Sequence, residues 1–454
     1  MLKITIIGGG YIGVLSGVCF CEFGFSVNIV ESDPLILRDL KNNIVSVYEP
    51  SLSATLKNHQ DNGRLRCAGD LNQTHENPDI FVIAIGPTTK EDQDESVHEV
   101  IRKISPLLSK TRYTVILIKT VTTVGACSII KKNMQFLRRD LTLGEHYDVV
   151  INPDFLREGY AMHDFITPSR LVIGLDQDSR KAEDMIVKLY STIISTGIPV
   201  IYTNHETAEL IKYASMAFIV TKTALINEFV DLCEKSGANV GQLILGTGLD
   251  PDIGLNLLQV TPGFGGRSPP ALMRGIIRTA CILGLEFRIM QTVLESNTTR
   301  IKNISEKILK RFIDEFGLCN NKKLAILGLA HKPNTNDLCE SPSMMLVQEM
   351  LKNKIFVSAY DPSLPPNSPN TSRIISKESL SDSRFHLAES PYEAAEQSDM
   401  IVVMTNWSNF LSIDFEKVAE LMNKRSGDPP ILMDMCNLYT ETYPKNFRYI
   451  GNGQ

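Results

Sequence analysis

The sequence lacks the features that would indicate a metal, nucleic-acid or membrane protein. Its nine cysteines form no Cys-x-x-Cys pair and no cluster with histidine at metal-ligand spacing. We therefore predict no metal site and interpret the cysteines as thiols of a reducing compartment. No long Lys/Arg run occurs and the formal net charge is −6, which argues against nucleic acid as the main partner.

Long apolar runs are also missing. No uninterrupted apolar run reaches the length of a membrane span, and a strand-like run that begins at residue 2 leaves no room for a signal peptide. We therefore expect a cytoplasmic protein without a membrane partner. With 454 residues, of which 43% are hydrophobic, the chain can build two or three cores.

Glycine is concentrated at one informative place near the N-terminus. Gly8, Gly10 and Gly13 follow the apolar run 4–7 and precede a helix of small residues predicted at 14–23. Glycines here permit a tight turn and let backbone N–H groups approach a pyrophosphate at a helix N-terminus. The pattern predicts a dinucleotide site, and the alternative is a glycine turn kept for packing alone.

The rest of this motif specifies the cofactor. Tyr11 and Ile12 lie within the glycine loop, and a second strand, predicted at 27–30, ends on Glu31. An acid at this spacing accepts hydrogen bonds from a ribose diol. Because its carboxylate would repel a 2′-phosphate, we predict NAD rather than NADP.

Farther along, short β-branched runs alternate with helical stretches, as in doubly wound α/β proteins. Strands are predicted at 4–7, 27–30, 80–85, 115–118, 149–151 and 171–173, and in a second block at 324–327, 356–360, 400–404 and 431–433. Long helical segments are predicted between the blocks at 208–236, 270–283 and 286–312. Loops are predicted at 246–270 and 362–383, where Gly, Pro, Ser, Asp or Asn are frequent.

These patterns predict two Rossmann-like, doubly wound α/β domains joined by a long central helical region. The predicted parts are an NAD-binding domain at 1–205, a helical connector and dimerisation domain at 206–316, and a ligand-binding Rossmann-like domain at 317–454. The ligand crevice is expected between the two α/β domains, at the carboxyl ends of the strands.

Several motifs, in order and spacing, resemble the UDP-glucose/GDP-mannose dehydrogenase family over essentially the whole chain. They are Tyr48-Glu49-Pro50, residues 152–159, residues 208–218, Ile226-Asn227-Glu228, residues 263–266, residues 332–337, Tyr360-Asp361-Pro362 and Thr405-Asn406-Trp407. The resemblance implies an N-terminal NAD domain, a central helix that builds a homodimer, and a C-terminal domain for a nucleotide diphosphate sugar.

The resemblance also implies a reaction. In the family, hydride leaves C6 of the sugar, a cysteine traps the aldehyde as a thiohemiacetal, and a second hydride transfer gives a thioester that water hydrolyses. The matching positions imply catalytic roles for Lys212, Glu158, Asp154 and the residue at the nucleophile position, Ser268. They imply that Thr120 contacts the cofactor and that the substrate is bound by Phe155, Leu156, Phe264, Gly265 and Lys332.

Much of that apparatus is replaced in this sequence. Ser268 stands where the family has its nucleophilic cysteine, and a serine hydroxyl is a far weaker nucleophile than a thiolate unless a base touches it. Other replaced positions are Ala271 for a lysine, Leu272 for an aspartate, Val121 for a threonine, Met216 for an asparagine, Asp154 for a glutamate, and Cys339 and Cys436 for arginines. The four-electron oxidation is therefore not expected, whereas a two-electron exchange needs only the retained residues.

Alternative interpretations stay open for individual residues. Lys212 can also be read as a surface or snorkelling lysine, Glu158 as a cap or a partner of Arg157, and Asp154 as a turn residue. His163, His205 and His331 are interpreted as ordinary polar or packed histidines, and Trp407 as a packing residue.

Three functions are compatible with this sequence. The first is a nucleotide-sugar oxidoreductase limited to one two-electron NAD step or to an altered substrate. The second performs the usual double oxidation with a rearranged site. The third is a catalytically inactive paralogue that binds NAD and a nucleotide sugar or partners an active homologue.

Overall fold

The computed structural model describes residues 2–74, 77–85, 93–317, 322–375, 382–423, 428–440 and 443–453. The chain divides into two compact units, Met1–Ser215 and Met216–Gln454, and the division falls inside one long helix, α9 (His205–Ser236). The predicted domain boundaries at 205/206 and 316/317 stay a prediction. Cys319 and part of the predicted loop 362–383 lie outside the described residues.

The first unit is built on a sheet of eight described strands in the order β3-β2-β1-β4-β5-β6-β7-β8. Neighbouring strands are parallel except for β6 and β7. The strands are β1 (Lys3–Ile7), β2 (Ser26–Val30), β3 (Leu65–Ala68), β4 (Ile80–Ile83), β5 (Thr114–Ile118), β6 (Tyr147–Ile151), β7 (Leu171–Gly174) and β8 (Val200–Thr203).

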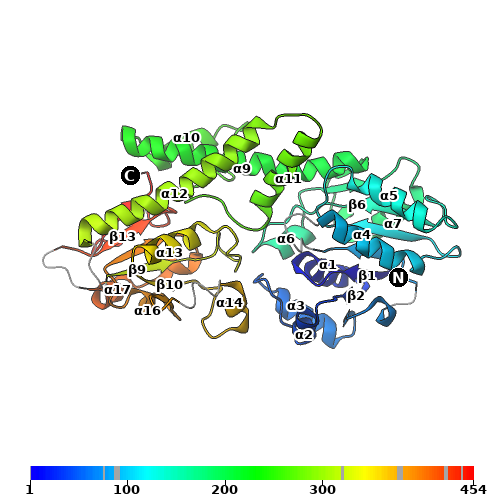
Figure 1. The fold of residues 1–454 in the computed structure, drawn as a ribbon, viewed down its shortest axis with the longest axis horizontal. Coiled ribbons are helices and arrows are strands. Elements are labelled where there is room, and N and C mark those ends of the chain that lie inside the picture. The colour runs from blue at the N-terminus through cyan, green and yellow to red at the C-terminus, as the bar shows by residue number, and fades with distance from the viewer. Residues whose placement is uncertain are drawn as a thin grey trace. The chain divides into compact units, whose positions relative to one another are not determined.

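Helices cover both faces of this sheet (Figure 1). Since side chains alternate along a strand, Ile80 and Val82 of β4 enter a core with α1, α3 and α7, while Phe81 and Ile83 enter a second core with α4 and α5. The helices that begin in this unit are α1 (Tyr11–Glu22), α2 (Pro34–Lys41), α3 (Leu52–Asp61), α4 (Gln93–Ile104), α5 (Ala126–Leu137), α6 (Ala161–Ile166), α7 (Arg180–Leu189), α8 (Ser191–Ile194) and α9.

The second unit combines helices with a second parallel sheet in the order β11-β10-β9-β12-β13-β14. The strands are β9 (Lys323–Leu327), β10 (Phe356–Tyr360), β11 (Phe385–Leu387), β12 (Met400–Val403), β13 (Ile431–Asp434) and β14 (Arg448–Gly451). The helices are α10 (Val240–Gly248), α11 (Ser268–Ile282), α12 (Arg288–Phe316), α13 (Pro342–Lys352), α14 (Pro369–Ile374), α16 (Pro391–Ala395) and α17 (Phe415–Leu421).

This sheet is also buried on both faces. Leu324 and Ile326 of β9 pack with α12 and α13, and Ala325 and Leu327 pack with α16 and α17. Trp407 is buried in the latter core, in agreement with its interpretation as a packing residue. The predicted fold class is therefore confirmed.

Two predicted loops contain helices. The loop prediction at 246–270 overlooked the end of α10, an apolar helix whose N-terminus is capped by the Asn239 side chain through the Gln242 N–H. The loop prediction at 362–383 was wrong for α14, which begins at Pro369, a residue favoured in the first helical turn.

Two further expectations concern the whole chain. Among the described residues, none of the helices has both the length and the apolar character that crossing a bilayer requires. The eight described cysteines are all free thiols.

The turn after β1 is held by close backbone packing. Gly8 adopts φ 111°, a conformation that side chains disfavour. A Cβ at Gly13 would lie 1.9 Å from the carbonyl oxygen of Gly8, so the start of α1 presses directly on the turn. A Cβ at Gly10, by contrast, would meet no heavy atom within 4 Å beyond its chain neighbours.

These contacts predict different outcomes at two glycines of one motif. Gly13→Ala should lower the free energy of unfolding by about 1–3 kcal/mol, because overpacking forces the backbone to shift. Gly10→Ala is the matched control and should lower the free energy of unfolding, measured from the unfolding curve in urea, by less, because its Cβ meets no heavy atom beyond the chain neighbours and only the N-cap preference for Gly over Ala is lost. Equal losses in both variants would contradict the packing role assigned to Gly13.

Candidate functional site

The glycine loop of the first unit ends in an open backbone surface at the start of α1. Gly10 is the N-cap of α1 and adopts an extended conformation, so the first N–H groups of the helix, which have no partner within it, lie beside a residue without a side chain. Tyr11 and Ile12, which follow it, are half-buried. This geometry fits a pyrophosphate, which binds at helix N-termini through backbone N–H groups and the helix dipole.

Glu31 lies beside this loop, as the sequence predicts. Its Oε2 accepts a hydrogen bond from the N–H of Gly9 at 2.7 Å, and its Oε1 accepts one from the N–H of Asp33 at 2.8 Å. The carboxylate is thus fixed in orientation while the residue stays partly exposed. These contacts suit an acceptor for ribose hydroxyls.

Thr120 joins the carboxyl ends of two central strands. Its hydroxyl accepts the N–H of Ile85 at 2.9 Å and lies 3.1 Å from the carbonyl oxygens of Ile83 and Ile85. The side chain is buried, so it fixes the segment that leaves β4. Whether Thr120 also contacts the cofactor stays a prediction.

Glu49, which belongs to the motif Tyr48-Glu49-Pro50 but had no role assigned from the sequence, holds the glycine loop. Its buried carboxylate accepts the Tyr11 hydroxyl at 2.7 Å and the N–H groups of Gly159 and Ala161 at 2.7 and 2.8 Å. Burial, followed by the charge of Glu49, raises the pKa of Tyr11. The carboxylate therefore ties the glycine loop to the segment that carries Glu158.

Lys212 and Asp154 form the central charged pair of the first unit. The Lys212 ammonium donates to the backbone carbonyl of Asp154 at 2.6 Å and lies 3.4 Å from its Oδ2. Both side chains are about nine-tenths buried. Lys212 is therefore not a surface lysine, and Asp154 is more than a turn residue.

The neighbouring residues of the same motif lie around this pair. Phe155 is half-buried, with the Lys212 ammonium 5.8 Å and the Arg170 guanidinium 3.9 Å from its ring centre. Leu156 packs against the core that contains α1. Glu158 is half-buried, and its charge contributes to the raised pKa of Tyr11, after burial and Glu49.

Arg157, the alternative partner of Glu158, is engaged elsewhere. Its backbone N–H, Nε and Nη2 all donate to the carboxylate of Asp164. The fork lowers the pKa of Asp164 against the opposing effect of burial. The ion pair between Arg157 and Asp164 thus holds the loop, and it does not define a role for Glu158.

In the second unit, the loop that resembles the family's nucleophile loop is pinned by a side-chain amide. The N–H of Phe264 donates to Asn297 Oδ1 at 2.8 Å, and Asn297 Nδ2 donates to the Phe264 carbonyl at 2.9 Å. Gly265 has no room for a side chain, since a Cβ would lie 2.4 Å from the carbonyl oxygen of Glu340. The backbone at Phe264 and Gly265 is thus fixed in position.

Ser268 is exposed and is the first residue of α11, followed by Pro269 and Pro270. Within the described residues of its own unit, its hydroxyl has no hydrogen-bond partner. Ala271 is exposed and Leu272 is buried, so the helix carries no charged group at these two positions.

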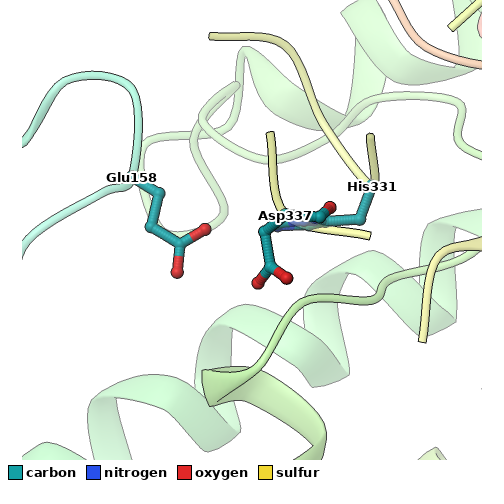
Figure 2. Close-up of side chains that lie close together, drawn as sticks. All are labelled: Glu158, His331 and Asp337. Atoms are coloured by element: carbon teal, nitrogen blue, oxygen red, sulfur yellow. The ribbon is translucent and has the colours of Figure 1, made fainter. Parts of the chain in front are cut away.

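His331 lies against the same loop. Its interpretation from the sequence as an ordinary polar or packed histidine did not include this contact. A Cβ at Gly266 would lie 2.7 Å from His331 Nε2, and His331 Nδ1 lies 3.1 Å from the Asp337 carbonyl. Figure 2 shows the side chains of His331 and Asp337. Burial, followed by the charge of the half-buried Lys332, lowers the pKa of His331. No sequence signal links positions 65 residues apart.

The carboxyl ends of β12 and β13 border a cavity of about 620 Å³, within the size range of ligand sites. Cys436, which stands at an arginine position of the family, lines it and donates from its thiol to the Met404 carbonyl at 3.2 Å. Burial, followed by Asp434, raises the pKa of Cys436. A protonated thiol supplies neither the charge nor the fork of an arginine.

The predicted site residues thus fall into three groups, two in the first unit and one in the second. The first unit brings together Lys212, Asp154, Phe155, Leu156 and Glu158, and separately Gly8, Gly10, Tyr11, Ile12, Gly13, Glu31 and Thr120. The second unit brings together Phe264, Gly265, Ser268 and Lys332. The roles of these residues stay predictions.

Comparisons with known proteins match three successive parts of the chain. Residues 2–194, 206–299 and 325–441 match the models of the UDP-glucose/GDP-mannose dehydrogenase family for its NAD binding domain, central domain and UDP binding domain. A UDP-glucose 6-dehydrogenase from Rhizobium meliloti is 33% identical over 459 residues, and the match covers 100% of this chain and 100% of that protein. One from Pseudomonas aeruginosa is 30% identical and covers 100% of this chain and 97% of its own.

Solved structures share the fold. A UDP-glucose dehydrogenase from Pyrobaculum islandicum superposes with a TM-score of 0.82 at 24% identity, covering 100% of this chain and 98% of its own. A UDP-D-ManNAc dehydrogenase from Pyrococcus horikoshii gives 0.81 at 21% identity, covering 100% and 99%.

The open surface at Gly10 predicts that NAD stabilises the protein selectively. NAD at about 100 times its Kd should stabilise the protein by about 2.7 kcal/mol, measured as a rise in melting temperature, and NADP should do so much less because of Glu31. Gly10→Val should abolish the NAD-induced shift by blocking backbone approach.

The matched control is Gly246→Val, since Gly246 in α10 is equally open but remote in sequence from the loop. It should retain the full NAD-induced shift. Equal stabilisation by NADP would contradict the role of Glu31, and a normal NAD shift in Gly10→Val would contradict the pyrophosphate site.

Proposed function

Because the chain belongs to the UDP-glucose/GDP-mannose dehydrogenase family, we propose that it is an NAD-dependent oxidoreductase acting on a CH–OH group of a nucleotide diphosphate sugar. The observation that supports this most is the buried Lys212 ammonium held on Asp154. A buried cation beside a carboxylate, at the end of a sheet that fits a dinucleotide, is suited to oxidation of an alcohol.

The chain's own residues supply three parts of this reaction. Gly10 and Glu31 hold the dinucleotide, Lys212 stabilises the negative charge that develops on the hydroxyl oxygen, and Glu158 orients the water that takes up the hydroxyl proton. When bound, NAD supplies the hydride acceptor. Lys332 and the loop at Phe264 and Gly265 contribute to sugar-nucleotide binding.

We propose further that the oxidation stops after two electrons. Ser268 presents an exposed hydroxyl in place of the thiol, and an alcohol is a weaker nucleophile and a poorer acyl leaving group than a thiol. His331 does not restore the chemistry in this proposal, because its Nδ1 lies 3.1 Å from the Asp337 carbonyl and its ring is packed closely against Gly266. The product expected is therefore an aldehyde.

A second candidate, a catalytically inactive paralogue that binds NAD and a nucleotide sugar or partners an active homologue, is favoured by one set of observations. Four further positions of the apparatus carry residues unable to perform its chemistry, namely Val121, Met216, Ala271 and Leu272. We predict a cytoplasmic location for the protein under either candidate function.

Turnover stoichiometry tests the proposal. Purified protein is mixed with excess NAD and with UDP-, GDP-, CDP- or dTDP-sugars, and both NADH and product mass are followed. With UDP-glucose we expect at most one NADH per sugar and no uronic acid, because Ser268 cannot hold a thioester. Two NADH per sugar with uronic acid would overturn the two-electron limit.

A single substitution should not restore the double oxidation. Ser268→Cys should produce no uronic acid, because the aspartate, amide and hydroxyl replaced by Leu272, Met216 and Val121 are still missing, and groups that act as a unit are strongly non-additive. Mass spectrometry of the product measures this. Uronic acid at a useful rate would show that neighbouring residues compensate.

We also propose a homodimer, formed through the second unit's part of α9. Apolar side chains recur there along one stripe and are exposed, including Phe218 at 80%, with Leu225, Phe229 and Leu232. A second exposed apolar group lies at the junction of α11 and α12, at Ile282, Leu283, Leu285 and Ile289. Clustered exposed apolar side chains on a single chain mark a surface suited to an interface.

Light scattering at micromolar concentration should give the mass of two chains. Phe229→Glu should shift the mass to one chain, because a carboxylate in an apolar two-fold contact is desolvated without a partner. Phe136→Glu, which changes an exposed aromatic of α5 in the first unit, is the control and should stay dimeric. A wild-type protein of monomer mass would contradict the dimer.

A further inference from the structure

Lys119 is a buried charged residue that the proposed reaction does not use. It follows β5 directly and is 4% exposed. Its ammonium donates to Asn152 Oδ1 at 2.9 Å and lies 3.5 Å from the Tyr190 hydroxyl, which donates to the same amide oxygen at 2.6 Å. Lys119 thus belongs to a small polar network enclosed in the first unit.

This network is unusual because the hydrogen-bond partners of the ammonium are neutral. Within the described part of the chain they are an amide oxygen and a phenol, and the ring of Phe165 lies 5.3 Å from the ammonium. A buried ammonium held by neutral groups lowers folding stability relative to an apolar side chain of similar volume. Packing alone therefore does not explain a lysine here.

The position of Asn152 connects this lysine to the proposed catalytic pair. Asn152, Pro153 and Asp154 are consecutive, and the Asn152 side chain is further anchored by donation to the Val172 carbonyl at 2.9 Å. Lys119 holds the first residue of this turn and Lys212 rests on the last, at the Asp154 carbonyl. Two lysines from different elements thus hold opposite ends of one three-residue turn.

We propose that Lys119 is a positioning residue for Lys212: it fixes the turn through Asn152, so that the Asp154 carbonyl stays where it orients the Lys212 ammonium. The functional part of this inference rests on the proposed role of Lys212, whereas its structural part does not.

The electrostatics of Lys119 provide a signature. Burial lowers its pKa to about 8, with an opposing effect of Asp154 and a smaller lowering by Lys212. The titratable groups that face it are Asp154, Lys212, Cys19 of α1 and Tyr190 between α7 and α8. Burial also raises the pKa of Cys19 and of Tyr190, so neither is ionised near neutral pH.

The sign of the pH effect follows from linkage. The unfolded chain has a lysine pKa of about 10.4, above the folded value of about 8, so between these two values the unfolded chain binds more protons and stability rises with pH. Below pH 8 both states are protonated and the destabilisation is fully present. Lys119→Met should therefore be at least as stable as wild type below pH 8, and its advantage should shrink towards pH 10.

The decisive measurement needs no turnover. Carbamylation of Lys212 by cyanate, followed by peptide mass spectrometry, reports how well the turn holds this amine. We expect labelling at least about threefold faster in Lys119→Met than in wild type, because the turn loses one of its anchors. Where a sugar is turned over, kcat should fall about tenfold to a hundredfold with little change in KM, since misplacement affects the chemical step.

Lys131→Met is the matched control. It removes the same group from α5, where Lys131 pairs with Asp176 at 2.7 Å, and should leave Lys212 labelling unchanged. Lys119→Gln provides a second variant that keeps a donor but no charge, and it should lose the pH-dependent stability signature as Lys119→Met does. Unchanged Lys212 labelling in well-folded Lys119→Met would overturn the proposal, whatever the activity of the wild type.

Discussion

The buried carboxylate of Glu49 is the interaction on which the first unit's site depends. It gathers the Tyr11 hydroxyl and two backbone N–H groups, those of Gly159 and Ala161. Those three donors come from segments far apart in the sequence, at the start of α1 and at the start of α6. Since a buried carboxylate is tolerated only with such donors, its position and theirs are mutually fixed.

A second constraint comes from the parallel sheet itself. Because parallel strands end at the same edge, the residues that follow β5 and β6, among them Lys119, Asn152 and Asp154, are brought together there. Helix α9 adds Lys212 from outside the sheet. The charged pair is therefore held from two directions, by the edge of the sheet and by a helix, and such support from regular elements fixes side chains precisely.

The parts of the fold that could be predicted share a physical cause. Central strands such as β4 and β9 are buried on both faces and appear in the sequence as continuous apolar runs. The strands without a prediction, β3, β8, β11 and β14, are the edge strands of the two sheets. Each of them contains exposed or half-buried residues, so the continuous burial that gives the central strands their apolar runs is missing.

The same contrast applies to the site. Glu31 and the glycine loop were predictable because their chemistry depends on local spacing, which a sequence displays. The contact of Asn152 with Lys119, or of Gly266 with His331, depends on how distant segments pack. Periodicity carries no information about such contacts. The one sequence signal for Lys119 was its place directly after an apolar strand, where the chain leaves the sheet.

The loop that carries Ser268 is held in a way that does not depend on the side chain at the nucleophile position. It is fixed by its backbone: the Gly266 N–H donates to the Cys339 carbonyl at 2.7 Å, and the Arg267 N–H donates to the Asp337 carboxylate at 2.9 Å. Neither bond involves the side chain of residue 268 or of residue 339. Replacing the nucleophile or the arginine at these positions therefore leaves the loop's hydrogen bonds intact. Because these hydrogen bonds use backbone N–H groups, the loop can keep its conformation when the side chains at positions 268 and 339 change.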